Sequence, residues 1–375
     1  MCASKQVTMR DVAAAAGVSH QTVSRVLNDR PDVAEETRSR IWQIIEELNY
    51  QPNAIARSLI HQRSLTLGIV TAGLKYDGPS RTLNGITKQA EKLGYTLLLK
   101  ELSGFHANDI QPLLNSLLSR RVDGILWAVP EVGDNRAWLE DQLNGLSAPL
   151  IFMQMQARPG ISIVAIDNYV GGRMATGHLL EQGYRHIGHI SGPLDWWEAR
   201  QRKAGWQDVL SAAGVPVAEW HSEEGNWSSA SGEPAIERLL ANYPDMDAVF
   251  VGNDQMALSV LQMACRRGIK VPHDLAVVGF DGLPETAHYW PPLTTVYQDL
   301  QNLGSTAVQE LVQAIEVGRD DRQVFEPRSI SLRPRLIVRE SSIGRNSSNG
   351  AIHQTEVGFP LKEMKQNESH TRSYR

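Results

Sequence analysis

The sequence predicts an all-α segment at the N-terminus, followed by an α/β module of two similar lobes, each a parallel sheet flanked by helices. Residues 1–50 carry only helix signals, whereas from about Leu65 to Ile343 short strand-like runs alternate with amphipathic stretches of helical length. The spacing of the strand-like runs changes near Asp167, which divides this second part in two. A chain of 375 residues is also longer than one compact core usually requires.

The N-terminal segment has the pattern of two short helices joined by a turn. Thr8 is placed to begin a helix over residues 9–16, and Gly17 then interrupts it. Ser19 is placed to cap a second helix over residues 20–27, because its hydroxyl can accept a bond from a free backbone amide. This spacing is compatible with a helix-turn-helix.

The remaining elements complete the division into domains. A third helix is expected from Glu35, with an apolar face made by Ile41, Ile44, Ile45 and Leu48. The strand-like runs are Leu65–Thr71, Thr96–Lys100, Gly124–Ala128, Leu150–Met153, Ile161–Ile166, His186–Ser191, Ala248–Val251 and Leu275–Phe280. The predicted boundaries are 1–50 for the helical headpiece, 51–64 for a linker with one short helical patch, 65–343 for the lobes and 344–375 for a disordered polar tail.

Composition narrows the classes of function. The net charge is −5, and the first 63 residues hold eight basic and seven acidic side chains, so bulk charge does not indicate a nucleic-acid partner. Cys2 and Cys265 are far apart and in no metal spacing, which suits a reducing compartment. Because neither a signal peptide nor a membrane-spanning run is recognisable, we expect a cytoplasmic protein without a membrane partner.

Catalytic and metal sites are not predicted. The sequence has no Walker loop, no Gly-x-Gly-x-x-Gly fingerprint and no Gly-x-Ser-x-Gly elbow. His186 and His189 are three residues apart on a predicted strand, which points them to opposite faces. Asp281 and Glu285 share only their acidity with a glycosidase pair. We therefore expect no enzyme activity and no bound cofactor or metal.

The second predicted helix leaves polar side chains on its outer face near its N-terminus. These are His20, Gln21, Ser24 and Arg25. Gln can form paired hydrogen bonds with adenine and Arg with guanine, so these residue types can read base edges in a major groove. The alternative is a three-helix bundle whose polar face is simply solvated.

Two stretches of sequence resemble a known family. The run from Thr8 to Asn28 closely resembles the headpiece signature of the LacI/GalR repressor family, and residues 48–53 are similar to the segment that leads into its hinge helix. The resemblance extends from about residue 6 to 342. It implies a helix-turn-helix headpiece joined to a sensor of two lobes that resembles periplasmic sugar-binding proteins.

The resemblance also implies a set of DNA contacts. The second helix would lie in the major groove, with His20, Gln21 and Arg25 as the base readers. Leu59 matches the hinge residue that the family inserts into the minor groove, where an apolar wedge bends the duplex; the alternative is an ordinary contact between domains. The expected contacts are Thr8, His20, Gln21, Ser24, Arg25, Asn28, Asn53, Ala56 and Leu59.

In this family a ligand lies in the cleft between lobes that are joined by three crossovers, here expected near Asp167, Gln298 and Arg328. Lobe 1 would contain about 65–166 and 298–327, and lobe 2 about 167–297 and 328–343. The expected ligand contacts are Arg202, Asn253, Asp281, Trp227, Gln298, Trp196 and Gln154. Alternatively, Arg202 could be a surface cation and Asp281 a cap for a helix near Pro284.

The residues of the predicted cleft indicate the class of ligand. Asp and Asn acceptors with an Arg donor can pair hydroxyls, while an indole face stacks on a sugar ring, so we expect a sugar or glycoside. Gln154 replaces a carboxylate found in the family, which implies a different hydroxyl pattern. A nucleoside would also stack.

The predicted function is a repressor of a carbohydrate-utilisation operon. One helix-turn-helix reads a half-site, so a homodimer is expected on a pseudopalindromic double-stranded operator, released by its sugar effector. The alternative regulator responds to a nucleoside or other metabolite used as corepressor. A transport component and a sugar-processing enzyme are the competing classes.

Overall fold

The computed structural model describes residues 7–27, 30–50, 63–105, 110–139, 146–319 and 322–344. Several sequence predictions lie outside these residues. They are the DNA contacts Asn28, Asn53, Ala56 and Leu59, the hinge helix, and the disorder of the tail beyond residue 344.

The headpiece consists of α1 (Met9–Ala16), α2 (His20–Leu27) and α3 (Glu35–Glu47). The predicted bounds of the first two helices and the start of the third are confirmed. Gly17 adopts a left-handed φ of 64°, which a residue without a Cβ accepts readily, and so ends α1. At the start of α2, the amide of Thr22 donates to Ser19 Oγ at 3.1 Å. The buried side chains include those of Val12, Val23 and Ile41.

Each lobe of the larger module is built on a six-stranded sheet. The first sheet has the order β11 (Ser329–Leu332), β5 (Ile163–Ile166), β4 (Leu150–Met153), β3 (Gly124–Ala128), β1 (Thr66–Ala72) and β2 (Thr96–Leu102). The second has the order β12 (Arg335–Ile337), β10 (Thr294–Tyr297), β9 (Ala276–Asp281), β8 (Ala248–Val251), β6 (Ile187–Ser191) and β7 (Ser222–Glu224). All neighbouring pairs are parallel except β10 and β12. The predicted fold class is therefore confirmed.

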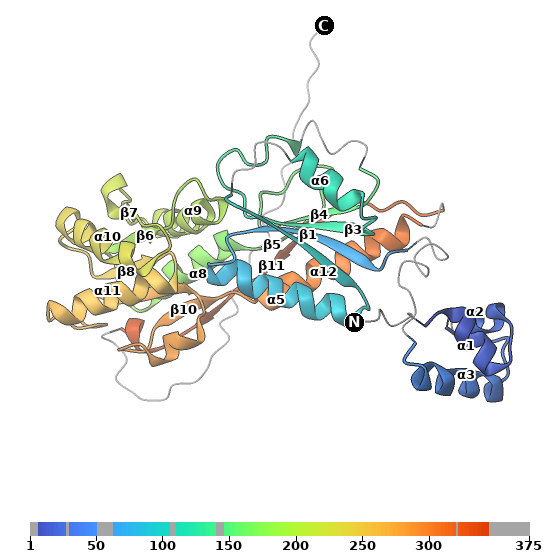
Figure 1. Ribbon diagram of the computed structural model, residues 1–375. Coiled ribbons are helices and arrows are strands. Elements are labelled where there is room, and N and C mark those ends of the chain that lie inside the picture. The colour runs from blue at the N-terminus through green and yellow to red at the C-terminus, as the bar shows by residue number, and fades with distance from the viewer. Residues whose placement is uncertain are drawn as a thin grey trace, which may run out of the picture.

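Helices cover both faces of each sheet (Figure 1). On the first sheet they are α5 (Asp77–Lys92) and α12 (Leu300–Val317) on one face and α6 (Gln111–Leu118) on the other. On the second sheet they are α8 (Asn168–Glu181) and α9 (Trp197–Ala212) on one face and α10 (Ser229–Asn242) and α11 (Asp254–Arg266) on the other. The described residues also contain the short 3-10 turns η1 (Glu219–His221), η2 (Pro284–His288) and η3 (Glu340–Ser342).

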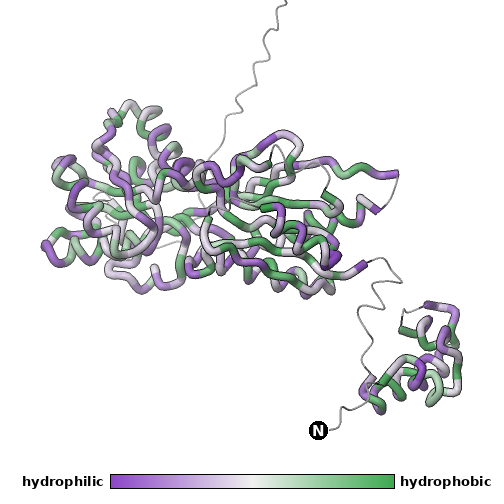
Figure 2. Tube along the Cα trace, turned by 45° about the horizontal axis from the view of Figure 1, so that its top comes forward, coloured by the Kyte–Doolittle hydropathy of each residue, from purple (hydrophilic) through white to green (hydrophobic). Residues whose placement is uncertain are grey.

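The central strands of each sheet, such as β3, β5, β6 and β8, are hydrophobic because both of their faces are covered. In Figure 2 the strands form the green interior of the lobes, and β8, for example, is fully buried along its length. Two helix pairs approach closely at glycine: a Cβ on Gly85 of α5 would overlap the carbonyl of Gln301 in α12, and one on Gly172 of α8 would overlap the carbonyl of Arg202 in α9. Within the described residues, no helix is both long and apolar enough to span a membrane.

The chain passes between the two sheets three times, after β5, after β10 and between β11 and β12. The third passage lies at Arg333 and Pro334, and not near Arg328 as the sequence suggested. Residues 329–332 therefore belong to lobe 1, because β11 pairs in parallel with β5 while β12 pairs with β10. The predicted assignment of 328–343 to lobe 2 is corrected accordingly.

Candidate functional site

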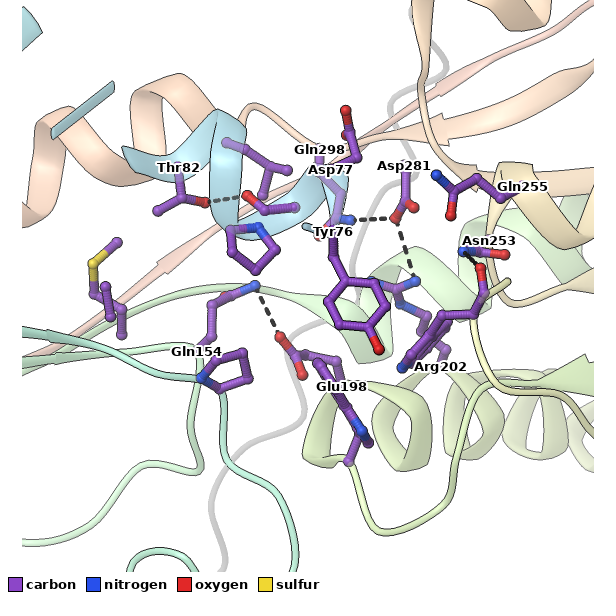
Figure 3. A pocket seen from close by; sticks show the side chains of 18 residues that line it. Tyr76, Asp77, Thr82, Gln154, Glu198, Arg202, Asn253, Gln255, Asp281 and Gln298 are labelled. Atoms are coloured by element: carbon purple, nitrogen blue, oxygen red, sulfur yellow. Dashed lines mark hydrogen bonds and ion pairs between the residues drawn. The ribbon is translucent and has the colours of Figure 1, made fainter. Parts of the chain in front are cut away.

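A cavity of about 100 Å³ lies at the boundary between the lobes, where the carboxyl ends of strands from both sheets meet (Figure 3). All seven residues expected to contact a ligand line it: Gln154, Trp196, Arg202, Trp227, Asn253, Asp281 and Gln298. The structure thus brings together side chains that are up to 144 positions apart in the chain (154 to 298).

Arg202 is held by a dense set of hydrogen bonds. Its Nε donates to Asn168 Oδ1 at 2.8 Å and its Nη1 to the carbonyl of Gly252 at 2.6 Å. The same Nη1 lies 3.4 Å from Asp281 Oδ1, which also accepts from Gln298 Nε2 at 2.7 Å. Arg202 is only 6% exposed, so the alternative of a surface cation is wrong. A charged donor is fixed at the cavity wall.

Two carboxyl groups lie near this donor, Asp254, which is fully buried, and Asp281, which is partly buried. Asp254 accepts from Thr295 Oγ1 at 2.6 Å and from the amide of Leu283 at 2.8 Å, so it secures the loop that leads into η2. Asp281 itself has a φ of 115° and faces Arg202, and among the described residues η2 begins after Leu283 without a side-chain cap, so Asp281 does not cap it. Burial raises the pKa of both carboxyl groups, and their mutual repulsion raises that of Asp254 further.

Aromatic side chains form another wall. Asn253 donates through Nδ2 to the carbonyl of Trp227 at 2.9 Å, and its Oδ1 accepts from the amide of Met256 at 2.9 Å. The rings of Trp196 and Trp227 meet edge to face, 5.8 Å apart. Trp197 packs instead against the core of lobe 1, so one of the two adjacent tryptophans lines the cavity, as expected.

Replacement of Gly192 by alanine is expected to push Trp227 out of place, because a Cβ there would overlap the indole ring. The variant should keep its far-UV circular dichroism but show tryptophan fluorescence that is more easily quenched by acrylamide. The change should vanish in a Trp227→Phe background. Gly104→Ala, where a Cβ has nothing within 4 Å, is the control. Equal quenching in the Gly192→Ala variant and the unaltered protein would show that the ring is not held there.

Lobe 1 forms the opposite wall of the cavity. Gln154 follows β4 with a φ of 51°, accepts from the amide of Ile166 at 2.8 Å and points its Nε2 at Glu198 Oε1, 3.4 Å away in lobe 2. Beside it, main-chain bonds join the lobes: the amide of Trp197 donates to Glu131 at 3.0 Å. The adjacent Val132 pairs with Trp196 as an isolated bridge.

The sequence reasoning missed several lining residues, of which Tyr76, Asp77 and Glu198 are the most polar or aromatic. Tyr76 and Asp77 stand where α5 begins after β1, at a strand's carboxyl end, which is a usable signal. Glu198 lies one helical turn before Arg202 and therefore on the same face of α9, a spacing that also could have identified it.

The second candidate site is the outer face of α2. Thr8, His20, Gln21 and Arg25 are exposed, while Val23 and Val26 on the opposite face are buried. Ser24 is half-buried. Arg25 Nη1 lies 3.4 Å from Asp32 Oδ2, with both side chains more than half exposed, so this pair is easily exchanged for another partner.

Comparison with known proteins gives two family matches. Residues 8–53 match "Bacterial regulatory proteins, lacI family", and residues 176–342 match "Periplasmic binding protein-like domain". The Lactose operon repressor of Escherichia coli K12 is 34% identical over 310 residues, covering 82% of this chain and 85% of that protein. The HTH-type transcriptional repressor PurR of Escherichia fergusonii is 34% identical over 339 residues, covering 89% and 96%.

Solved structures agree with this assignment. A lac repressor dimer bound to operator and an anti-inducer superposes with a TM-score of 0.79 at 32% identity, covering 91% of this chain and all of that one. A complex of the transcriptional regulator CelR with cellobiose gives 0.66 at 32% identity and covers 90% of this chain. With its headpiece, its two sheets and these relatives along most of its length, the chain belongs to the lacI family of bacterial regulatory proteins.

Proposed function

We propose that this protein is a transcriptional repressor that binds a pseudopalindromic operator as a homodimer and releases it when a sugar or glycoside fills the cavity between its lobes. The observation that carries the proposal is the cavity itself, where Arg202, Asp281 and Asn253 meet two indole rings. Fixed donors and acceptors can pair the hydroxyls of a sugar while an indole covers its C–H face.

The headpiece supports the DNA-binding part of the proposal. Exposed Gln21 and Arg25 project from a short helix whose other face is buried, which is how a recognition helix presents side chains to base edges. One headpiece reads one half-site, so a two-fold dimer matches a pseudopalindrome. The relative bound to operator is a dimer by its description.

Gln21→Ala is expected to weaken binding to the preferred operator by about 1–3 kcal/mol and to relax base preference at one position of each half-site. Fluorescence anisotropy with a selected operator and its single-base variants measures this. Gln43→Ala, an exposed glutamine on α3 that bonds Glu47, should leave the preference unchanged. A uniform loss of affinity for every duplex would contradict base reading by Gln21 and favour a phosphate contact.

The control by ligand follows from the position of the cavity. Its walls come from both lobes, so a bound molecule has different contacts when the lobes are arranged differently, and this difference limits how far it can shift the operator equilibrium. Gel shifts with genomic fragments, challenged by cellobiose and a panel of other sugars, test the proposal. Release of operator without consumption of the sugar is expected; consumption would instead support an enzyme.

A nucleoside or other metabolite acting as corepressor is the second candidate. The edge-to-face pair of Trp196 and Trp227 favours any flat ligand that can stack, a base included. The same gel shifts distinguish the two: a nucleoside that strengthens operator binding, with no response to any sugar, would select this alternative.

A further inference from the structure

The cavity contains a buried carboxyl group, that of Glu198, of which only one oxygen has a hydrogen-bond partner among the described residues. Glu198 is 7% exposed and lies in the first turn of α9. Its Oε1 accepts a long bond of 3.4 Å from Gln154, whereas its Oε2 is buried and has no hydrogen-bond partner among the described residues. Figure 3 shows Gln154 and Glu198 at the cavity. A buried acceptor without a donor costs about 1–3 kcal/mol, so folding alone gives no reason for this oxygen to be there.

The nearby cations are already engaged. Arg202, one turn along the same helix, donates to Asn168 and Gly252 and lies beside Asp281. Arg136 of lobe 1 donates through Nη1 and Nη2 to main-chain carbonyls and to an asparagine side chain, and its Nε, which has no partner among the described residues, forms no bond to Glu198. Within the described residues Glu198 forms no ion pair, so its carboxyl group is available to interact with a ligand.

The charges of all the lining residues together also favour a neutral ligand. Three carboxyl groups, Asp77, Glu198 and Asp281, face the cavity, and Arg202 is the single cation among the described residues that line it. A hydroxyl can donate to Glu198 Oε2 at no electrostatic cost. Asp77 is paired with Arg81 and Asp281 with Arg202, so a phosphate or carboxylate in the same place would meet the unpaired carboxyl group of Glu198 in a site of low dielectric.

We propose that Glu198 sets the charge selectivity of the cavity: it accepts a hydrogen bond from a hydroxyl of a neutral sugar and excludes phosphorylated sugars. This inference rests on the proposed function, because it names the class of sugar that the regulator detects. Two further buried polar atoms that have no partner among the described residues, Gln298 Oε1 and Trp227 Nε1, belong to residues that line the same cavity, and they suit the hydroxyls of such a ligand.

The first test needs no ligand. Burial raises the pKa of Glu198 to about 7, opposed by Arg202 and Arg136 and assisted by Asp281. The folded protein therefore holds this proton more tightly than the unfolded chain, and stability falls as the pH rises from about 4.5 to about 7. Glu198→Gln removes this loss, so its melting temperature should exceed that of the unaltered protein by about 2–4 °C at pH 8, and the difference should shrink toward pH 5.

A matched control separates a functional carboxylate from a structural one. Glu310 is also buried, but Arg328 donates to both of its oxygens at 2.6 and 2.7 Å. Glu310→Gln should therefore lower the melting temperature. If Glu198→Gln lowers it in the same way at pH 8, Glu198 has a structural role and the proposal is wrong.

The second test measures selectivity by thermal shift and titration calorimetry. The probes are glucose, galactose, cellobiose and lactose, each with its 6-phosphate. At least one neutral sugar, and none of the phosphates, should stabilise the unaltered protein, and Glu198→Gln should bind the phosphate of that sugar at least tenfold more tightly than the unaltered protein does.

Stabilisation by a phosphate equal to that by its neutral parent would overturn the charge selectivity. If no sugar shifts the unaltered protein, the sugar effector of the proposed function fails, whereas the ligand-free comparison across pH still decides the role of Glu198.

Discussion

Replacement of Arg202 by methionine is expected to abolish the response to ligand and to lower the free energy of unfolding by about 3–5 kcal/mol. The substitution leaves the carboxylate of Asp281 without its cation. It also removes the N–H groups that donate to Asn168 Oδ1 and to the carbonyl of Gly252. The same change removes the charged donor that the described residues place in the cavity wall. Urea unfolding measures the stability, and anisotropy with operator in the presence of sugar measures the response.

Two further variants make this result interpretable. Arg200→Met alters an exposed arginine on the same helix that, among the described residues, donates to main-chain carbonyls alone, and should leave both measurements nearly unchanged. Arg202→Met combined with Asp281→Asn removes the unpaired charge, so stability should partly return while the response stays lost. A double variant that still responds to sugar would exclude both side chains from ligand binding.

Replacement of Gly85 by alanine is expected to destabilise lobe 1 by about 1–3 kcal/mol. A Cβ at this position would overlap the backbone of Gln301, and the contact is reciprocal, because a Cβ on Gly304 of α12 would overlap the carbonyl of Thr82 in α5. Backbone cannot rotate aside as a flexible side chain can, so the two helices must separate. The midpoint of urea unfolding reports the change.

Gly78 provides the comparison within the same helix. A Cβ there has nothing within 4 Å, and alanine is the better helix former, so Gly78→Ala should leave the midpoint unchanged or raise it. Similar losses in both variants would mean that helix propensity, and not the contact between α5 and α12, governs the effect at Gly85.

Much of the architecture was predictable because its signals are local. Gly17 and Ser19 fix the ends of α1 and α2, and the buried strands are continuous apolar runs. By contrast β7, β10, β11 and β12 are short and contain polar or charged residues in place of a continuous apolar run. In β11 apolar and polar residues simply alternate, and only its pairing with β5 assigns it to lobe 1 and moves the third crossover to Arg333.

The candidate site was predictable where a residue ends a strand or stands in the family's motifs, as Asp281 and Asn253 do. Its partnerships were not. The sequence around Asp254 does not show that this residue secures a loop 29 residues away. The sequence around Glu198 does not show that one of its oxygens lacks a partner among the described residues. Such properties depend on which groups meet after folding, so they emerge only with the assembled lobes.

Partners within lobe 2 hold Arg202, Asp254 and Asn253 in place, so these side chains are positioned before a ligand binds. An incoming molecule encounters this half of its binding surface already arranged, so little conformational entropy remains to be lost there. Lobe 1 adds Tyr76, Asp77 and Gln154 from the opposite side. The polar groups of lobe 2 are thus held in place by the protein itself before any other molecule is bound.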